Sequence, residues 1–422
     1  MYSIIKSDCL TFYNDLKSQD LGFWAACAYL VFAYMKPQVT FPALDFLPWV
    51  QVSILIGLGY LFSKGQISFQ ISHVAMFIFF LLVLNSAYLA YYPDYAFKRM
   101  DIVYIQLVEM IFFTNCIRNI KQFKLILMFF FLVLFKMSFF GAKTWVTRGF
   151  GFTSWGISGP TGLFANSGEF SLLMAVYATI AIGYISGQKL TTKLYWLVPI
   201  TAVMTVLGAS SRGSQIAIVI GLLYMAFRMG KLKISNIVYG AILVFLVYSV
   251  FPAEQKERFS SMGEDDTSQS RMKYWGAGIE MMNDHKLTGV GYFGFAQYYQ
   301  DYYKSNDLQS GYLAGRREVA HNSLVEVGSE IGYPGLILYL WFHLLGFFQV
   351  RRARKILSKM EPKVGSEDWL GKFQIGFETS LIVYFVGAFF MSVAYYPYIY
   401  LLLMISQSLL NSAKAEFAEC KL

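Results

Sequence analysis

Long apolar stretches recur along the whole chain, and no other feature of the sequence constrains the fold as much. A helix needs about 20 mainly apolar residues to cross the hydrocarbon core of a bilayer. The chain of 422 residues is 56% hydrophobic and only 14% charged, which is too apolar for a soluble protein of this length. We therefore predict an all-α integral membrane protein with about 12 transmembrane helices. The stretches are 21–35, 46–62, 73–91, 102–116, 124–141, 169–187, 194–208, 214–229, 235–252, 333–350, 375–393 and 396–411.

One segment between the predicted spans is much longer than the others, and Gly, Ser and charged residues enter the sequence together there. We predict three parts on this basis. They are an N-terminal transmembrane bundle of about nine spans at 1–252, a partly helical segment with amphipathic helices and the candidate active-site residues at 253–332, and about three C-terminal transmembrane helices at 333–422.

Basic residues predict the orientation, because Lys and Arg in short loops resist translocation across the membrane. The loop 351–374 holds seven of them and is predicted to be cytoplasmic. Both termini then lie in the cytoplasm, and 253–332 faces the other side. The formal net charge of +9 follows from this topology, so we expect no nucleic-acid partner. The four cysteines show neither metal-ligand spacing nor a disulfide pattern.

Arg212 lies in a setting typical of an anion site. Small residues from Gly208 to Ser214 surround it and would let a ligand approach the backbone. The helix predicted after it begins with unpaired N–H groups that point outward. A guanidinium there can hold a diphosphate through two parallel hydrogen bonds. The alternative is an arginine that only extends its head group to the membrane surface.

Four further arginines fall on the predicted outer side, against the trend for basic residues to stay inside. Arg271 opens a stretch in which apolar residues recur at helical spacing, and we predict a helix lying on the membrane surface. Arg271 would then sit at the depth of a lipid-linked diphosphate, although the stretch can equally serve packing alone. The apolar residues are Met272, Trp275, Ile279 and Met282, and the other three arginines are Arg148, Arg316 and Arg317.

His321 is the candidate base. It directly precedes Asn322 and Ser323, either of which can cap a helix, and Ser323 with Glu326 has the spacing of a capping box. The positive end of a helix dipole favours neutral imidazole, which accepts a proton near pH 7. A structural role stays open. The other histidines, His73, His285 and His343, read as packed or solvated side chains.

Three further features have ordinary explanations beside the functional ones. Tyrosines are dense between Tyr292 and Tyr312, where they can stack on sugar rings or form the aromatic belt of a membrane interface. Gly289 to Gly294 matches G-x-G-x-x-G, but it follows no predicted strand, so we predict a turn. The acidic run Glu264 to Asp266 has no nearby histidine and reads as a solvated loop.

In chain order, these features resemble the O-antigen ligase and Wzy-type polymerase superfamily. The likeness runs from about Arg148 to the helix after Gly335. It rests on the order of the motifs more than on any one of them. The motifs, in chain order, are Ser211-Arg212-Gly213, Arg271 with Trp275, Gly289 to Gly291, Ala320-His321-Asn322, and Glu330 to Gly335.

The resemblance implies a GT-C-like glycosyltransferase that works without metal or cofactor and inverts the anomeric centre. The donor it implies is a polyprenyl (undecaprenyl) diphosphate, and the location is the bacterial inner membrane, with the active site on the periplasmic face. By position, Arg212 and Arg271 bind the diphosphate and His321 is the base. The predicted substrate-binding residues are Arg148, Trp275, Tyr298, Tyr302, Arg316, Arg317 and Asn322.

The partners implied are a lipid-linked oligosaccharide donor, a glycan or lipid A-core acceptor, membrane lipids, and proteins of polysaccharide export or chain-length control. The tyrosine-rich stretch slightly favours a polymerase of O-antigen or exopolysaccharide repeat units over a ligase that acts on lipid A-core.

A transporter or flippase of lipid-linked sugars is the alternative from another functional class. Such a pathway usually has ionisable residues near the midplane, and the predicted spans read as nearly uncharged apart from Glu109, Lys136 and His343.

Overall fold

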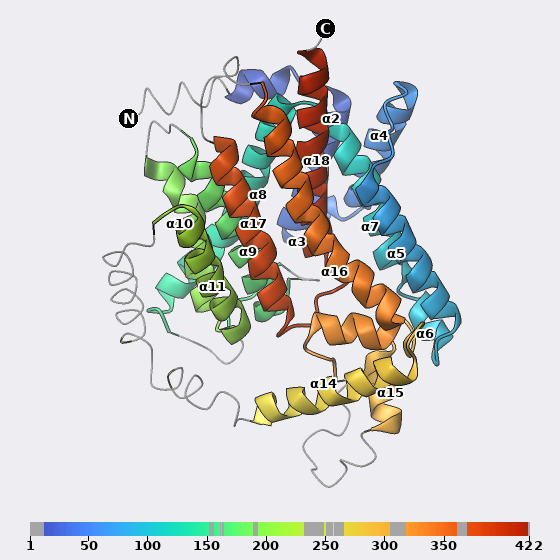
Figure 1. Ribbon diagram of the computed structural model, residues 1–422. Coiled ribbons are helices and arrows are strands. Elements are labelled where there is room, and N and C mark those ends of the chain that lie inside the picture. The colour runs from blue at the N-terminus through green and yellow to red at the C-terminus, as the bar shows by residue number, and fades with distance from the viewer. Residues whose placement is uncertain are drawn as a thin grey trace.

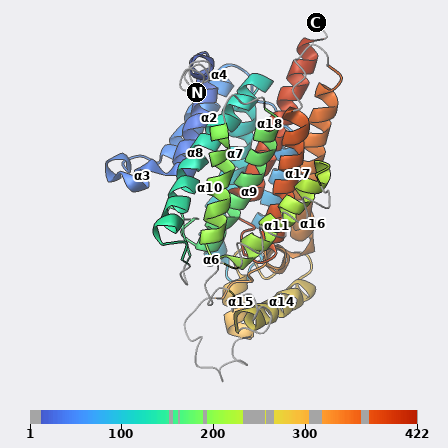
Figure 2. The same cartoon turned by 90° about the vertical axis from the view of Figure 1, so that its left-hand side faces the viewer.

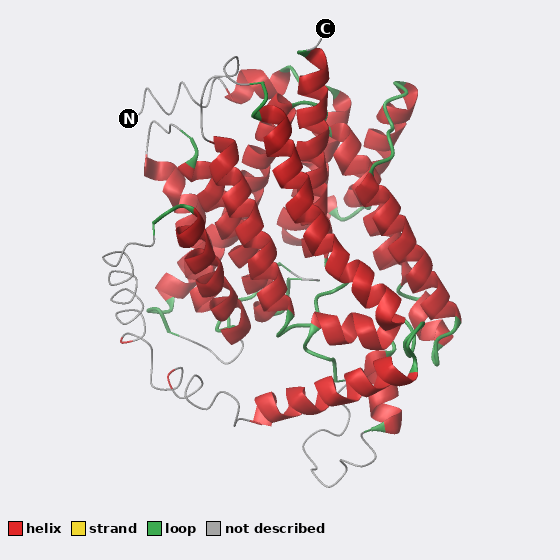
Figure 3. Cartoon of the chain, in the orientation of Figure 1, coloured by secondary structure: helices red, strands yellow, loops and turns green. Residues whose placement is uncertain are grey.

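The computed structural model describes residues 12–151, 156–160, 162, 164–188, 193–231, 249, 256, 266–303, 318–360 and 369–420. Most helices stand side by side in one bundle (Figure 1), and the view turned by 90° shows the same arrangement (Figure 2). Helices α14 and α15 instead lie across one end of this bundle. The regular structure of the described residues is entirely helical, without a strand (Figure 3). The prediction of an all-α chain is therefore confirmed for this part of the protein.

The helices agree with the apolar stretches wherever the structure describes them. The stretch 235–252 lies outside the described residues except for Ser249. The elements are α2 (Leu21–Leu30), η1 (Val31–Met35), α3 (Pro37–Thr40), η2 (Pro42–Leu44), α4 (Trp49–Ser63), α5 (Ile71–Tyr88), α6 (Pro93–Phe97), α7 (Met100–Cys116), α8 (Ile120–Thr147), α9 (Ser167–Ser186), η3 (Lys193–Trp196), α10 (Leu197–Gly208), α11 (Arg212–Arg228), α14 (Asp266–Asp284), α15 (Phe295–Tyr302), α16 (Ser323–Leu357), α17 (Trp369–Ala388) and α18 (Pro397–Glu419).

Five helical stretches among the described residues are long and apolar enough to cross a membrane. Two further apolar helices, Leu21–Met35 and Lys193–Gly208, are shorter. The predicted total of about 12 spans remains a prediction. The five stretches are Pro42–Ser63, Ile71–Tyr88, Ile120–Thr147, Ser167–Ser186 and Ser323–Leu357.

Helices α9 and α18 form the centre of the bundle. Every residue from Phe170 to Ala181 and from Tyr398 to Leu410 is buried, as expected for a helix that is covered on all sides. Helix α17 packs closely on α9 because both carry glycine at the contact. A Cβ atom added to Gly183 would lie 2.5 Å from the Cα of Gly376, so a larger residue would force the helices apart.

Helix α16 bends sharply near its start, and the bend turns its first part across the end of the bundle. Gly332 has φ 78° and ψ −175°, and Pro334 follows inside the helix. Proline cannot donate the helical hydrogen bond, and the left-handed φ suits glycine. The predicted span 333–350 therefore begins at the bend, and the residues before it belong to a separate short arm.

The segment from Gly289 to Gly294 contains turns, as predicted. Gly289 has φ 64°, and a Cβ atom there would collide with the backbone of Glu330. The N–H of Val290 donates to the carbonyl of Ser329 at 2.8 Å. This turn therefore attaches the segment that carries α15 directly to the short arm of α16.

Candidate functional site

A cavity of about 400 Å³ lies where several helices begin, at the end of the bundle covered by α14 and α15. The first residues of α9, α11 and α16 reach it, so their positive dipole ends point toward one space. Its lining residues come from six separate stretches of the chain. They are Asn166, Ser167, Gly168, Glu169, Ser210, Ser211, Arg212, Gly213, Arg271, Phe293, Val319, His321, Glu326, Phe390, Met391, Ser392, Tyr395 and Tyr396.

Arg212 is the first residue of α11, and the turn before it explains its position. Ser210 adopts φ 58°, a left-handed conformation that reverses the chain between α10 and α11. The side chain of Ser211, the N-cap residue, lies 3.2 Å from Ser214 Oγ and does not cap the backbone N–H groups of the helix, which leaves the first N–H groups to other partners. The Ser210 side chain is 8% exposed, and its Oγ has no hydrogen-bond partner among the described residues. The uncapped start of α11 therefore offers backbone N–H donors to an anion.

Arg271 reaches the cavity from α14, which is a helix as the sequence predicted. Helix α14 is held against α16 at Gly278, where an added Cβ would collide with Val325. The indole Nε1 of Trp275 donates to the carbonyl of Ala320 at 3.0 Å. Trp275 was predicted to bind substrate, but it does not line the cavity and instead fixes α14 to the residue before His321.

His321 lines the cavity in a left-handed conformation with φ 50°. Its N–H donates to Ser392 Oγ at 3.0 Å. Burial, and after it the guanidinium of Arg271, lower the pKa of His321 to about 4. The imidazole is therefore neutral at pH 7, which is the state that a base requires.

Asn322 is the N-cap of α16, and its Oδ1 accepts from the N–H of Leu324 at 2.9 Å. It is 2% exposed, so it shapes the site without lining the cavity. The predicted capping box of Ser323 and Glu326 is wrong. Ser323 Oγ donates to the carbonyl of Met391 at 2.8 Å, and Glu326 accepts from the N–H of Ala394 at 3.2 Å. Both side chains hold the loop before α18 in place of capping their own helix.

Other predicted substrate-binding residues lie elsewhere. Arg148 is exposed at the end of α8 and does not line the cavity. Tyr298 and Tyr302 stack on each other, with ring centroids 4.3 Å apart, and Tyr298 packs edge-on against Tyr91 at 4.8 Å. These tyrosines form a surface cluster outside the cavity. Arg316 and Arg317 lie outside the described residues.

Sequence reasoning missed two carboxyl groups in the cavity, Glu169 and Glu326. Each lies in the first turn of a helix, where an acidic residue is ordinary because it complements the helix dipole. Composition therefore gave no signal of a special role. Within the described part of the chain, no group of three or more His, Cys, Asp or Glu side chains is placed to hold a metal ion.

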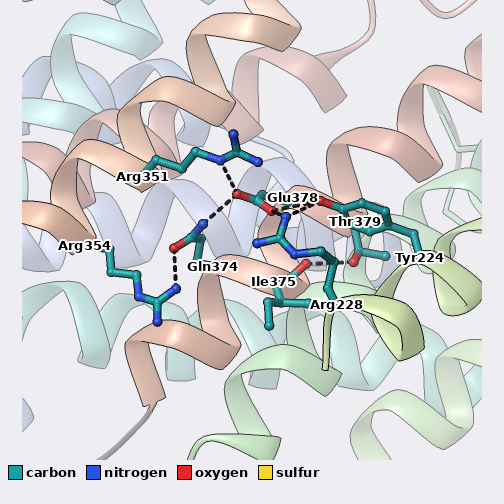
Figure 4. Close-up of polar contacts among 8 residues, drawn as sticks. All are labelled: Tyr224, Arg228, Arg351, Arg354, Gln374, Ile375, Glu378 and Thr379. Atoms are coloured by element: carbon teal, nitrogen blue, oxygen red, sulfur yellow. Dashed lines mark hydrogen bonds and ion pairs between the residues drawn. The ribbon is translucent and has the colours of Figure 1, made fainter. Parts of the chain in front are cut away.

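A second polar cluster lies away from the cavity and corrects the prediction of nearly uncharged spans. Glu378 of α17 is completely buried and accepts from Arg228 at 2.9 Å and from Arg351 at 2.6 Å. Tyr224 and Gln374 also donate to it, at 2.9 Å and 2.6 Å (Figure 4). This cluster links α11, α16 and α17, so the buried charge is balanced by partners from neighbouring helices.

A comparison with protein families supports the resemblance to O-antigen ligases. Residues 197–340 match a family model described as O-antigen ligase. This stretch is about a third of the chain and contains Arg212, Arg271 and His321. No curated protein matches the chain.

Proposed function

We propose, from the membership of residues 197–340 in the O-antigen ligase family, that this protein transfers a glycan from a polyprenyl diphosphate to an acceptor hydroxyl. We place the reaction at the periplasmic face of the bacterial inner membrane. One observation carries the proposal: Arg212, Arg271 and His321, far apart in the sequence, line the same cavity. The two arginines and the helix N-termini suit a diphosphate leaving group. The neutral imidazole of His321 suits a base that accepts the proton of an attacking hydroxyl.

The basic part of the cavity would bind the diphosphate. Arginine holds phosphate oxygens through paired hydrogen bonds, and helix N-termini add N–H donors and a positive dipole end. Because these groups are already in place, they stabilise the negative charge that grows on the leaving group as its bond breaks.

His321 would take the proton of the acceptor hydroxyl. The acceptor oxygen attacks the anomeric carbon from the face opposite the diphosphate, and a new glycosidic C–O bond forms. The bond between the anomeric carbon and the diphosphate oxygen breaks, and the polyprenyl diphosphate leaves with the electron pair. The acceptor proton passes to the imidazole, and attack from the opposite face inverts the anomeric centre.

We favour a polymerase of O-antigen or exopolysaccharide repeat units over an O-antigen ligase. The surface cluster of Tyr91, Tyr298 and Tyr302, in which Tyr91 and Tyr302 are exposed, supports this choice, because aromatic faces suit a long glycan better than a phosphorylated core. The contacts of Glu378, drawn in Figure 4, argue against the alternative of a transporter. Glu378, the fully buried carboxyl of α17, is engaged by two arginines, whereas a transport pathway needs charges that can change partners.

The decisive experiment incubates purified protein with a defined lipid-diphosphate oligosaccharide, with and without lipid A-core. A ladder of longer lipid-linked chains from donor alone is expected. The His321→Ala variant should bind this donor about as well as wild type and transfer about 100-fold to 10,000-fold more slowly. Product that forms only after lipid A-core is added would replace polymerase by ligase. No transfer under either condition would refute the proposed function.

A further inference from the structure

Phe293 lines the cavity in a backbone conformation that is unusual for a bulky residue. Its φ of 56° lies in the left-handed region, where a side chain of this size raises the free energy of the fold. Such a conformation lasts only when neighbouring groups hold it, and positions of this kind cluster at sites that hold a ligand. The Phe293 side chain is half-buried, so part of its ring is open to whatever enters the cavity.

The buried carboxyl of Glu330 fixes this conformation. Glu330 belongs to the short arm of α16 and is 3% exposed. It accepts from the N–H of Phe293 at 3.1 Å and from the N–H of Phe295 at 3.2 Å. The hydroxyl of Tyr395 donates to it at 2.7 Å. Phe293 and Tyr395 line the cavity, whereas Glu330 does not. Glu330 can therefore act on a ligand only through the residues that it holds.

The ring of Phe293 is held in place as well as its backbone. Its centroid lies 4.8 Å from that of Tyr292 and 5.1 Å from that of Tyr395, and the guanidinium of Arg99 lies 5.2 Å from it. A ring that is already fixed loses little freedom when it contacts a ligand. Sugars are suitable ligands, because their C–H groups carry a partial positive charge and the face of an aromatic ring is negative.

The sugar expected beside Phe293 is the one that the donor diphosphate carries. Its anomeric carbon is bonded directly to the diphosphate, so Arg212 and Arg271 would bring this sugar into the cavity that Phe293 lines. The acceptor needs to bring in only its attacking hydroxyl. We propose that Phe293 contacts the first sugar of the donor and that Glu330 is the positioning residue that holds Phe293 in place. This inference rests on the proposed function and names what selects its donor sugar.

Two lipids distinguish a sugar contact from a diphosphate contact. One is the lipid-diphosphate oligosaccharide, and the other is the same polyprenyl diphosphate without sugar. Calorimetric titration in detergent uses the His321→Ala protein, which is expected not to consume the donor. Adding Phe293→Leu should weaken binding of the sugar-bearing lipid about threefold to tenfold and leave the bare diphosphate unchanged. Phe62→Leu on α4, where the ring is 81% exposed, is the matched control and should change neither affinity.

This titration does not depend on turnover, so it decides the inference even if wild-type protein transfers no glycan. Equal weakening of both lipids would place Phe293 at the diphosphate and overturn the inference. Unchanged binding of both lipids would overturn it as well. In the transfer reaction, Phe293→Leu should raise KM for the donor and not for the acceptor, a water-soluble oligosaccharide of one repeat unit. A rise in the acceptor KM alone would assign Phe293 to the acceptor instead.

A double-mutant cycle tests whether Glu330 acts through Phe293. Glu330→Gln keeps the size of the side chain, but its amide nitrogen cannot accept a hydrogen bond. It should weaken binding of the sugar-bearing lipid alone, and the double variant should bind no more weakly than the weaker single variant. Additive losses would overturn the positioning role. Tyr395→Phe, which removes one donor to Glu330 and keeps the ring, should give the same pattern more mildly. Glu419→Gln, exposed near the end of α18, is the matched control and should behave like wild type.

Discussion

His321 adopts a backbone conformation that costs free energy for any residue except glycine, about 1 kcal/mol or more. Its φ of 50° is maintained by the bond from its N–H to Ser392 and by the capped start of α16 directly after it. Strain of this kind persists where the surroundings fix it, and it is common at functional sites. The sequence could identify His321 as a candidate base but not this conformation, because Ser392 lies 71 residues away.

The lowered pKa of His321 predicts an unusual pH profile. A base with a pKa of about 4 stays unprotonated down to about pH 5, so kcat/KM should be flat from about pH 8 to about pH 5 and fall only below that. The unfolded chain binds this proton with an ordinary pKa of about 6.5, so the folded state also loses stability as the pH falls from about 6.5 to about 4. An acidic limb of kcat/KM near pH 6.5 would contradict the assignment.

Arg212→Lys should lower kcat/KM for the lipid-diphosphate donor about tenfold to a hundredfold. Lysine keeps the charge but cannot form two parallel hydrogen bonds to a diphosphate. Arg352→Lys, exposed toward the far end of α16, is the matched control and should behave like wild type. Wild-type turnover in a well-expressed Arg212→Lys protein would remove Arg212 from the donor site.

At the scale of elements, hydropathy predicted where the helices lie, because burial in lipid requires long apolar runs. It also placed the start of the span 333–350 next to the break at Gly332. The direction of the short arm before that break could not be predicted, since it depends on contacts with a turn about forty residues earlier. The same holds for Glu326, which sequence spacing assigned to its own helix and which instead binds the loop before α18.

Gly332→Ala should lower the free energy of unfolding by about 1 to 3 kcal/mol. The residue has φ 78°, and an added Cβ would lie 2.6 Å from the carbonyl oxygen of Lys286. Gly276→Ala on α14 is the control, because nothing lies within 4 Å of a Cβ there. Thermal unfolding in detergent compares the two. Equal melting temperatures would show that the bend of α16 tolerates a side chain.

On the scale of the whole molecule, two polar clusters hold the bundle together at separate places. The cavity joins the beginnings of α9, α11 and α16, and Glu378 links α11, α16 and α17 elsewhere along their length (Figure 4). Helices α11 and α16 take part in both. The apolar helices alone specify burial but not register, and the two clusters supply directional contacts that favour one arrangement.

Glu378→Gln should lower stability modestly and leave both substrate constants unchanged. The side chain keeps its shape but loses its charge, while Arg228 and Arg351 are 30% and 51% exposed and can turn to solvent. We expect a loss of about 1 to 2 kcal/mol, measured by thermal unfolding against Glu419→Gln. A large rise in either KM with unchanged stability would show instead that the cluster communicates with the cavity.

The residues that line the cavity are far apart in the sequence, so they are synthesised at different times during translation. The stretch 197–340 contains both arginines and the histidine, yet the wall is completed by residues on either side of it, from Asn166 to Glu169 and from Phe390 to Tyr396. When translation has reached residue 340, Arg212, Arg271 and His321 have all been made. The part of the cavity wall from Phe390 to Tyr396 has not. The cavity is complete only when α17 and the loop before α18 are in place, so we expect a chain that ends at residue 340 to be inactive in the proposed transfer.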